Sequence, residues 1–495
     1  LLLSSELIWN LKSDLAVTWL TGYQDGDHDN IQDAWGSPEV LRDQLVQNEG
    51  DLFSTEVRID NLASANRLRW LVGANYLADS EYRFEDNISF DERGNGGGRI
   101  VPRPETHLQT YGDSETEAFG VFGELTIDLT DQWNVTIGGR YSDDSRKATI
   151  WTDAWGFANA ISTVGVVDNG LGDPNRSCLL NVFVDPGTGL DVCGTADNPM
   201  GFDPIDMSDS WDNFSAKVSL TYALDDQNTI YALYSEGFKA GGFQHDARSE
   251  TALVDNLVDS ETVQNFELGW KGAYERASFA VTAFQIEQKN AQNLALVPVG
   301  AGNTNVITNF GGSEALGLEI EGTFLISDNL KVGGNIALYD AELGSGSVIG
   351  AFSDPVTGEI TGEDVSGERP SNAPKQTYVL WGEYIWDLAN DSSLRLRADI
   401  QHRGDVWGSL SNRDTLSLDG TELVYLRPAI NNVGVNLDWT AADGRTVVSL
   451  WGRNLTEDVD KVTFGPGLAA HFNGGAPPRG YRGRKQIGVD VSFRF

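Results

Sequence analysis

A set of aromatic residues in the predicted loops has the clearest potential for contact with a ligand. Their flat, apolar rings could stack on a planar ligand above a water-filled entrance. They are Trp35, Trp151, Trp155, Phe157, Trp211, Phe238, Phe243, Trp407, Phe464 and Phe472. The alternative is that they pack loops together or belong to an aromatic belt at a membrane surface. The sequence leaves both roles open for each residue.

Charged residues at alternate positions of predicted strands form a second set. A charged residue that alternates with apolar ones lies on the opposite face of a strand from them. If the strands close into a barrel in a membrane, these side chains face its wet interior. The set comprises Arg140, Lys271, Glu319, Glu321, Arg395 and Arg397.

No arrangement typical of catalysis occurs, so we do not expect an enzyme. The histidines are scattered among loops and strand ends, without a His-Glu-x-x-His or a Gly-x-Ser-x-Gly motif. The segment Asp25-Gly-Asp-His-Asp-Asn30 is similar to a calcium-binding loop, but Asn30 replaces the glycine at position six and Gly36 the glutamate at position twelve. We favour a solvated acidic loop over a calcium site there. We predict no metal site and no cofactor.

The two cysteines, Cys178 and Cys193, lie in one predicted loop. In an oxidising compartment such a pair would form a disulfide, and closing so short a loop contributes roughly 3 kcal/mol in the chain-entropy model. Two free thiols are the alternative. A metal site is not expected because no histidine lies nearby.

The elements that carry these residues are predicted to be strands with one apolar face. The odd positions from Ile487 to Phe495 are apolar and alternate with polar or small residues, and the chain ends on an aromatic. The same period of two recurs at 216–224, 394–401 and 432–439. The closing strand of an outer-membrane barrel presents apolar side chains to lipid and polar ones to a wet lumen. The pattern therefore predicts an all-β fold, an antiparallel up-and-down transmembrane barrel.

Composition agrees with this fold and limits the partners. Hydrophobic residues make up 40% of the chain, and no apolar run of about 18 residues that could form a membrane helix occurs. The formal net charge of -38 argues against nucleic acid as a partner, because phosphate would be repelled. We expect the acidity to reflect a solubilising, salt-adapted surface. An acidic site built for a cationic ligand is the alternative.

Connections of two lengths alternate along the chain. Short ones rich in Asp, Asn and Ser occur at 12–14, 61–66 and 390–392, and long ones run near 25–50, 88–114 and 151–208. In outer-membrane barrels, short turns face the periplasm and long loops face the outside. Counting gives about 17 strands. Because such a barrel closes with an even number, we expect further strands before Leu1, so that 1–495 is one barrel domain truncated at its amino end.

Several segments carry a family resemblance through their order and spacing. Thr229-Ile-Tyr-Ala-Leu-Tyr-Ser-Glu-Gly-Phe-Lys-Ala-Gly-Gly-Phe243 is a strand that runs into an aromatic, glycine-rich loop. It is followed by Asn265–Gly272, Glu314–Gly322, Arg369-Pro-Ser-Asn-Ala-Pro-Lys375, Leu450-Trp-Gly-Arg-Asn-Leu-Thr456 and Pro477-Pro-Arg-Gly-Tyr481. In this order they resemble the carboxyl-terminal barrel of TonB-dependent outer-membrane receptors. The resemblance implies a 22-stranded barrel behind a plug domain with a TonB box, and the plug, the box and about five strands are absent from this chain.

The resemblance also implies a function and partners. It indicates a receptor in the outer membrane of a Gram-negative bacterium that imports a scarce nutrient, in the first place a ferric siderophore complex, with energy from TonB acting on the missing plug. Cobalamin, haem and oligosaccharides stay open as ligands. Outer-membrane lipid and, through the terminal strand, the barrel-assembly machinery are further implied partners, and the six charged residues would meet the plug. The alternative is a passive porin or a surface-binding barrel without an energised step.

Overall fold

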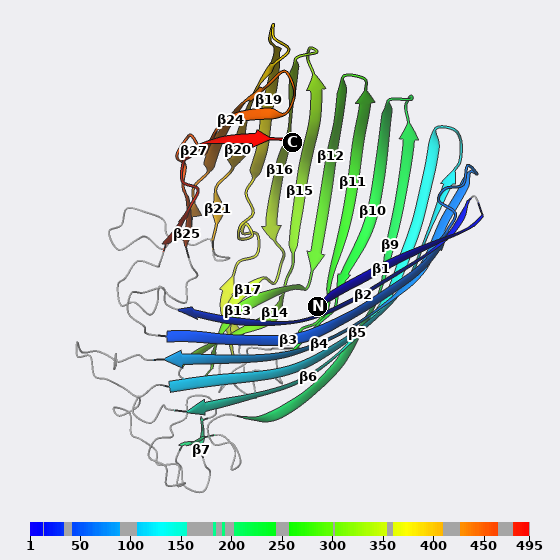
Figure 1. The fold of residues 1–495 in the computed structure, drawn as a ribbon. Coiled ribbons are helices and arrows are strands. Elements are labelled where there is room, and N and C mark those ends of the chain that lie inside the picture. The colour runs from blue at the N-terminus through cyan, green and yellow to red at the C-terminus, as the bar shows by residue number, and fades with distance from the viewer. Residues whose placement is uncertain are drawn as a thin grey trace.

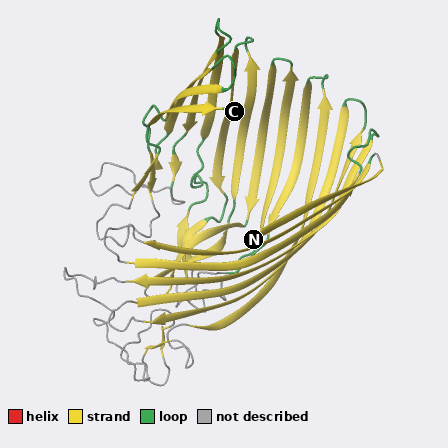
Figure 2. Cartoon of the chain, viewed as in Figure 1, coloured by secondary structure: helices red, strands yellow, loops and turns green. Residues whose placement is uncertain are grey.

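The computed structural model describes most of the strands and part of the connections. The described residues are 1–12, 14–33, 42–89, 106–155, 182–184, 191–193, 202–243, 257–299, 302–353, 360–408, 426–463 and 479–494. Within these ranges the chain forms strands, turns and loops and no helix (Figure 2). None of the described segments is therefore a helix that could span a membrane.

One large antiparallel sheet of 17 strands dominates the molecule (Figure 1). Its strands are β1 (Leu2–Lys12), β2 (Leu15–Asp33), β3 (Arg42–Asp60), β4 (Leu68–Ser89), β5 (Thr106–Asp128), β6 (Trp133–Trp155), β9 (Phe202–Ala223), β10 (Asn228–Lys239), β11 (Glu261–Tyr274), β12 (Ala277–Lys289), β15 (Ser313–Leu325), β16 (Leu330–Leu343), β19 (Gln376–Asp387), β20 (Ser393–Arg403), β23 (Ile430–Thr440), β24 (Thr446–Arg453) and β27 (Gln486–Phe493). Each strand pairs with the next one in this order. The predicted up-and-down topology and strand count are confirmed.

Small two-stranded hairpins occupy five of the long connections. They are β7 (Val182–Val184) with β8 (Asp191–Cys193), β13 (Ala291–Val299) with β14 (Gly302–Phe310), β17 (Val348–Ser353) with β18 (Ile360–Asp364), β21 (Val406–Trp407) with β22 (Leu426–Arg427), and β25 (Asp460–Thr463) with β26 (Arg479–Arg482). All of them lie at the same end of the sheet, because long connections alternate with short turns. Within the described residues, β1 pairs only with β2 and β27 only with β24.

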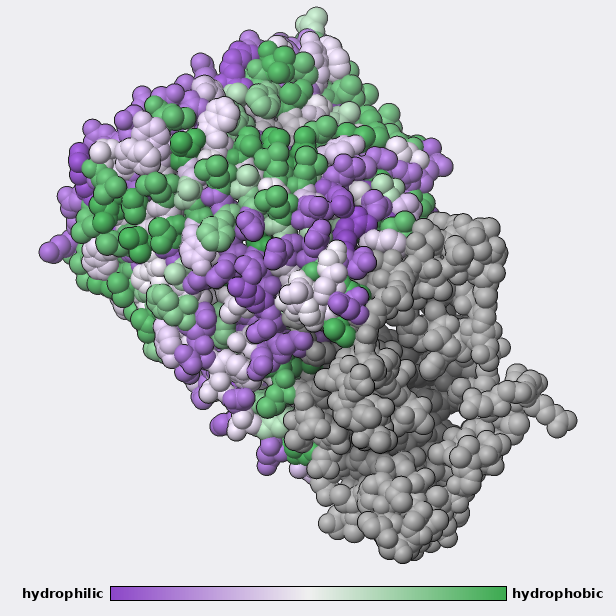
Figure 3. All heavy atoms as spheres, turned by 180° about the vertical axis from the view of Figure 1, so that it is seen from behind, coloured by the Kyte–Doolittle hydropathy of each residue, from purple (hydrophilic) through white to green (hydrophobic). Residues whose placement is uncertain are grey.

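The two faces of the sheet differ in chemistry. In β11, Phe266, Leu268 and Trp270 are exposed, and they alternate with Glu267 and Lys271. We call the face with exposed apolar side chains the outer face and the opposite one the inner face. Figure 3 shows apolar residues gathered over much of the described surface on one side of the sheet. Exposed aromatic and aliphatic side chains in this number suit lipid as their surroundings.

The short turns are stabilised by their own side chains. Between β9 and β10, the Asp225 carboxylate accepts hydrogen bonds from the backbone N–H groups of Gln227 and Asn228, both at 2.8 Å. Such bonds from Asp fix a tight turn because they replace backbone partners. The predicted alternation of short turns and long connections is confirmed.

The long connections begin later than the sequence indicates. The ends of the predicted loops 25–50, 88–114 and 151–208 belong to β2 to β6 and β9, which contain 19 to 23 residues each. These ends are residues 25–33 and 42–50, 88–89 and 106–114, and 151–155 and 202–208. The segment Asp25–Asn30 is part of β2 and pairs with β3, so its prediction as an acidic loop is wrong. In a strand, successive side chains point to opposite faces, so these oxygen atoms do not surround one ion as they do in a calcium loop.

Buried apolar side chains gather at the end of the sheet that carries the long connections. Ile150 in β6 is fully buried, and Phe243 and Val258 in the connection between β10 and β11 are 5% and 2% exposed. A second cluster consists of Ala291, Leu343 and Val365. The described connections therefore have packed contacts of their own. These contacts lie beyond the part of the sheet whose outer face is apolar.

Candidate functional site

Five neighbouring long strands, β3, β4, β5, β6 and β9, form an extended wall. We define it as residues 42–54, 77–89, 106–118, 144–155 and 202–211, which the register brings side by side. One inner-face row runs from Leu52 through Asp79 and Thr116 to Arg146. Neighbouring strands lie about 4.8 Å apart. The row therefore places an apolar, an acidic, a hydroxyl and a basic side chain within roughly 15 Å of one another.

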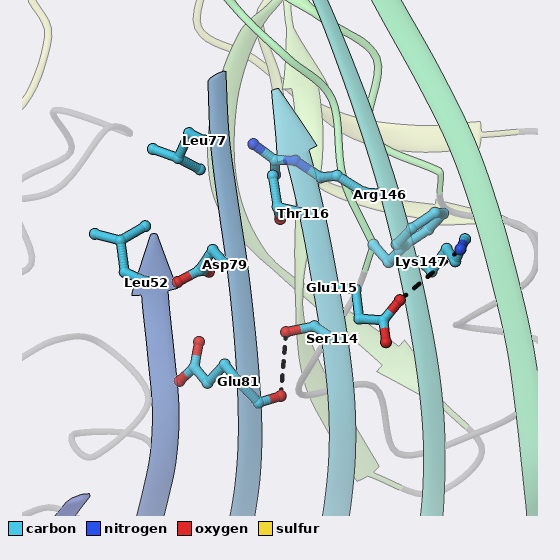
Figure 4. Close-up of a pocket in the computed structure, with 10 residues that line it drawn as sticks. Leu52, Leu77, Asp79, Glu81, Ser114, Glu115, Thr116, Arg146 and Lys147 are labelled. Atoms are coloured by element: carbon cyan, nitrogen blue, oxygen red, sulfur yellow. Dashed lines mark hydrogen bonds and ion pairs between the residues drawn. The ribbon is translucent and has the colours of Figure 1, made fainter. Parts of the chain in front are cut away.

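A cavity of about 400 Å³ opens over this row (Figure 4). Leu52 and Leu77 supply apolar lining, and Ser114 and Thr116 supply hydroxyl groups. The Ser114 hydroxyl donates a hydrogen bond to the backbone carbonyl of Glu81 at 3.4 Å. A concave site with apolar walls and a few polar groups is the usual form of a small-molecule site.

The charged groups of this cavity have few internal partners. The carboxylates of Asp79 and Glu81 make no hydrogen bond or ion pair with the described residues. The Nε atom of Arg146 is shielded from solvent and lacks a hydrogen-bond partner in the same part of the chain. One step further along the inner face of β4, by contrast, Arg83 and Glu85 form an ion pair of 2.8 Å. The cavity thus keeps three charged groups free to contact a ligand.

Residues 240–243 and 257–259 of the connection between β10 and β11, which we call the strap, close one side of the cavity. Gly242 and Val258 exchange two backbone hydrogen bonds of 3.0 Å, and Phe243 lines the cavity. The Phe243 ring lies 6.1 Å from the Trp211 ring of β9. A Cβ atom on Gly241 would overlap the Val258 carbonyl and the Trp211 indole. Glycine is therefore required for this close approach to the wall.

The strap is held to hairpin β13–β14 by side-chain amides. Gln292 donates hydrogen bonds to the carbonyls of Ala240 and Asp259 at 2.8 and 3.0 Å. Asn309 donates to the carbonyl of Asp259 at 2.9 Å, and its own Oδ1 accepts from the Asp259 N–H at 2.7 Å. Hydrogen bonds thus join the connection between β10 and β11 to the connection between β12 and β15, which contains this hairpin.

The predicted ligand-contacting aromatics separate into distinct places. Trp211 and Phe243 come together at the inner-face cavity. Trp151 lies on the outer face, where it stacks on Tyr111 at 5.0 Å, and Phe238 shares the outer-face positions of β10 with Tyr234. Trp407 is in β21, away from the others. Four of these residues, Trp151, Trp155, Trp211 and Phe238, belong to the main strands, so their prediction as loop residues is wrong. Trp35, Phe157, Phe464, Phe472 and the side chain of Trp155 lie outside the described residues.

The six predicted charged residues all occupy inner-face positions by register. Arg395 donates to the nearly buried Asp438 through Nε at 2.9 Å, and both Arg395 and Arg397 lie within 4 Å of Glu383, at 3.6 and 3.8 Å. A second cavity of about 520 Å³ includes Lys271, Glu321 and Trp381 in its lining. Arg140 lies over the Phe122 ring, and Glu319 is next to Thr282 across the strands. Their contact with a plug stays a prediction.

Other predicted sites fall partly outside the described residues. Cys178 and the side chain of Cys193 are among those not described, so the disulfide stays a prediction. No group of three or more potential metal-ligating side chains occurs in the described ranges.

An ion pair joins two long connections near β21. Arg369 donates to Asp405 at 2.7 Å, and Arg369 is 13% exposed. This hydrogen bond lowers the pKa of Asp405 from its ordinary value, although partial burial opposes the effect. The carboxylate therefore stays ionised and holds the connection after β20 against the segment before β19.

The cavity residues Asp79, Glu81 and Arg146 were not among the sequence candidates. The sequence of β4 contains a signal for Asp79 and Glu81. Apolar residues occupy the even positions Val72, Ala74 and Tyr76, and charged residues then occupy the odd positions from Asp79 onward, which share the opposite face of the strand. The meeting of Arg146 with Thr116 has no such signal, because cross-strand neighbours depend on register between distant segments.

Comparison with known proteins places the fold. The chain matches the family model described as TonB dependent receptor-like, beta-barrel, over residues 3–455. The chain therefore belongs to the family of TonB-dependent receptor β-barrels. Members of this family are outer-membrane proteins and transporters rather than enzymes, which confirms the predicted location and the prediction that the chain is not an enzyme.

Solved structures share this fold at low sequence identity. The ferric yersiniabactin uptake receptor FyuA from Yersinia pestis matches with a TM-score of 0.68 and 15% identity, over 100% of this chain and 60% of that one. The siderophore receptor PiuA from Acinetobacter baumannii matches with 0.65 and 15%, over 99% and 64%. The ferric citrate transporter FecA matches with 0.62 and 14%, over 100% and 61%. The chain thus spans about three-fifths of the length of the first of these proteins.

Proposed function

We propose that this chain is the barrel part of an outer-membrane receptor that takes up a ferric siderophore complex with energy from TonB. The extended wall projects on the side of the long connections, which faces the outside in such barrels. Its cavity captures the complex, and a plug inside the barrel, contacted by Arg140, Lys271, Glu319, Glu321, Arg395 and Arg397, transmits the energised step.

The single observation that supports this proposal most is the cavity on the inner face of the extended wall. Its volume of about 400 Å³ lies in the range of small-molecule sites. Leu52 and Leu77 suit the hydrocarbon parts of a chelate, and the hydroxyl and charged groups suit its polar parts. A passive pore has no need for such a partly closed site on its outer side.

Uptake measurements test the proposal. The receptor gene is expressed in a bacterium that lacks its own siderophore receptors, and accumulation of radioactive iron is followed with several ferric siderophores. We expect accumulation that stops when TonB is deleted or the proton gradient is dissipated. Accumulation that survives both treatments would overturn the energised step and favour a passive barrel.

Conductance in planar bilayers separates the receptor from a porin. A closed barrel without a plug should form a wide aqueous pore, because charged walls hold water. The same barrel with its plug should be nearly sealed. Equally large and steady currents from both forms would favour the porin.

A further inference from the structure

The cavity of the extended wall contains more acidic than basic groups. Asp79 and Glu81 lie on the inner face of β4, and Asp144 and Asp209 flank Arg146 along β6 and across to β9. Asp144 and Asp209 lie beside the cavity rather than in its lining, which contains Asp79, Glu81 and Glu115 as acids and Arg146 and Lys147 as bases. Glu115 and Lys147 are an ion pair of 3.8 Å, so Asp79 and Glu81 are the carboxylates of the lining without a partner in the described residues. Charges without partners are unfavourable in a partly enclosed site unless a ligand or water compensates them.

The arrangement of the two free carboxylates fits a cationic nitrogen. Asp79 and Glu81 are two residues apart on one strand face, so their Cα atoms are about 7 Å apart. Thr116 and Ser114 are their direct neighbours on β5. A protonated amine has three hydrogen-bond donors and no acceptor, so it can bond to both carboxylates and to one hydroxyl at once.

On the basis of the proposed function, we infer that the cavity takes a metal chelate with a protonated amine, which binds between Asp79 and Glu81. Arg146 donates hydrogen bonds to oxygen acceptors of the same chelate. Leu52, Leu77 and Phe243 contact its hydrocarbon spacer. A chelate with several negative charges is repelled by the carboxylates, so the substrate class is cationic or neutral rather than polyanionic.

Equilibrium binding to the purified receptor tests this inference with three probes. Ferrioxamine B, a trihydroxamate complex with one free amine, is compared with its N-acetylated form, which lacks the charge, and with a trianionic ferric tris-catecholate. Loss of a charge-assisted hydrogen bond corresponds to about tenfold or more in affinity. We expect the free amine to bind at least about tenfold more tightly than the acetylated form, and the trianion to bind most weakly.

Isosteric variants assign the effect to residues. In Asp79→Asn/Glu81→Gln, the advantage of the free amine over the acetylated form should disappear. In Arg146→Gln, both forms should weaken by the same factor, because this residue contacts shared oxygen atoms. The matched control is Glu49→Gln, an exposed carboxylate of β3 on the outer face, which should change none of the ratios.

Several outcomes overturn the inference without touching the proposed function. An acetylated form that binds as tightly as the amine, a trianion that binds most tightly, or an amine advantage that persists in Asp79→Asn/Glu81→Gln would each do so. Failure of the proposed function has a different signature, since iron accumulation would then not depend on TonB whatever the binding ratios. Heat-dependent migration on gels confirms that each variant is folded.

Discussion

Two halves of the same sheet differ in the length of their strands. Strands β2 to β6 and β9 contain 19 to 23 residues, whereas β10 to β27 of the main sheet contain 8 to 14. A tilted strand of about 9–11 residues already crosses a bilayer core. The short strands therefore end near the membrane surface, while the long ones continue for about ten residues beyond it. The difference means that one half of the sheet ends near the membrane surface while the other half extends beyond it, and we propose that this extension is a platform for binding.

The residues on the outer face of the long strands change from apolar to acidic where the strands pass from lipid into water. Along β3, exposed Val57 and Phe53 are followed at the same face by Asp51 and Glu49. Along β5, Val121 and Phe119 are followed by Glu117 and Glu115. Acidic residues directly after an apolar band mark the place where lipid gives way to water.

The inner faces of the two halves also differ. In the short half, several charges are matched within the sheet, as at Arg395 with Asp438, or lie over aromatic rings, as Arg397 does over Trp381 at 4.4 Å, while Glu319 and Glu321 have no hydrogen bond or ion pair among the described residues. In the extended wall, Asp79, Glu81 and Arg146 are left without ion pairs in the described part. Matched charges such as Arg395 with Asp438 stabilise the barrel, and the unmatched Asp79, Glu81 and Arg146 are available to a ligand of the cavity.

The largest expected effect is on the free energy of unfolding, when an arginine is placed on the outer face of β3 either in the apolar band or beyond it. Val57→Arg should lower the free energy of unfolding by about 2–4 kcal/mol, because arginine near the bilayer centre is desolvated. Glu49→Arg should leave it unchanged within about 0.5 kcal/mol, since Glu49 faces Asp27 across the strands and arginine relieves that repulsion. Chemical unfolding in liposomes measures both values. Equal losses would break the distinction between lipid-facing and water-facing parts of one strand.

The next effect concerns matched charges in the short half. Arg395→Leu should lower the free energy of unfolding by about 1.5–3 kcal/mol, because the Asp438 side chain, 6% exposed, is left without its charged partner. Arg397→Leu should cost less than about 1 kcal/mol, since this residue has only a longer contact to Glu383 and a ring contact. Adding Asp438→Asn to Arg395→Leu should restore part of the loss. Identical costs for the two arginines would contradict the assigned roles.

A smaller and local effect is expected in the strap over the cavity. Gly241→Ala should raise amide exchange at Gly242 and Val258 roughly 5-fold to 30-fold, because about 1–2 kcal/mol of local stability is lost when the strap lifts from Trp211. The control is Gly242→Ala, whose Cβ would meet only the flexible Arg146 Nη1 at 3.1 Å. Hydrogen exchange followed by mass spectrometry compares the two. Unchanged exchange in Gly241→Ala would show that the strap does not need this close contact.

The smallest effect is the pH response of Asp405. Its pKa is lowered by Arg369, so the ion pair contributes stability above the ordinary pKa of about 3.9 and loses it as pH falls through the lowered value. Asp405 is half exposed, which keeps the contribution small. A carbon NMR titration of the carboxylate should give a midpoint below that of the Arg369→Gln variant. A midpoint that is the same in both proteins would refute the role of Arg369.

The fold could be predicted from the sequence because each strand carries its own evidence. Alternation at 394–401 and 432–439 depends only on neighbouring residues, and Asp and Asn in the turns act locally. The outer parts of β2 and β5 were missed for the opposite reason. Asp25 to Asn30 and Asp113 to Glu117 have polar residues on both faces, so the period of two is lost when both sides meet water.

The candidate site was only partly predictable. Trp211 and Phe243 were found as aromatics, but their meeting depends on a strap that returns from the connection after β10 to β9. The row from Leu52 to Arg146 joins four segments of the chain whose register is set by long-range pairing. Residue types therefore indicated the aromatic members Trp211 and Phe243, whereas only the three-dimensional arrangement indicated Asp79, Glu81 and Arg146 and showed which side chains lie together.

The central claim is that the long strands cross lipid at one end and stand in water at the other. A nitroxide scan along β5 from 111 to 127, in liposomes and with Cys178 and Cys193 replaced by serine, tests it most directly. Collision rates with oxygen and with a water-soluble nickel chelate are measured at each position. We predict lipid exposure at odd positions from 119 to 127 and water exposure at odd positions from 111 to 117, with even positions never facing lipid. Lipid exposure that continues at odd positions to Tyr111, or that is missing between Phe119 and Ile127, would contradict the account.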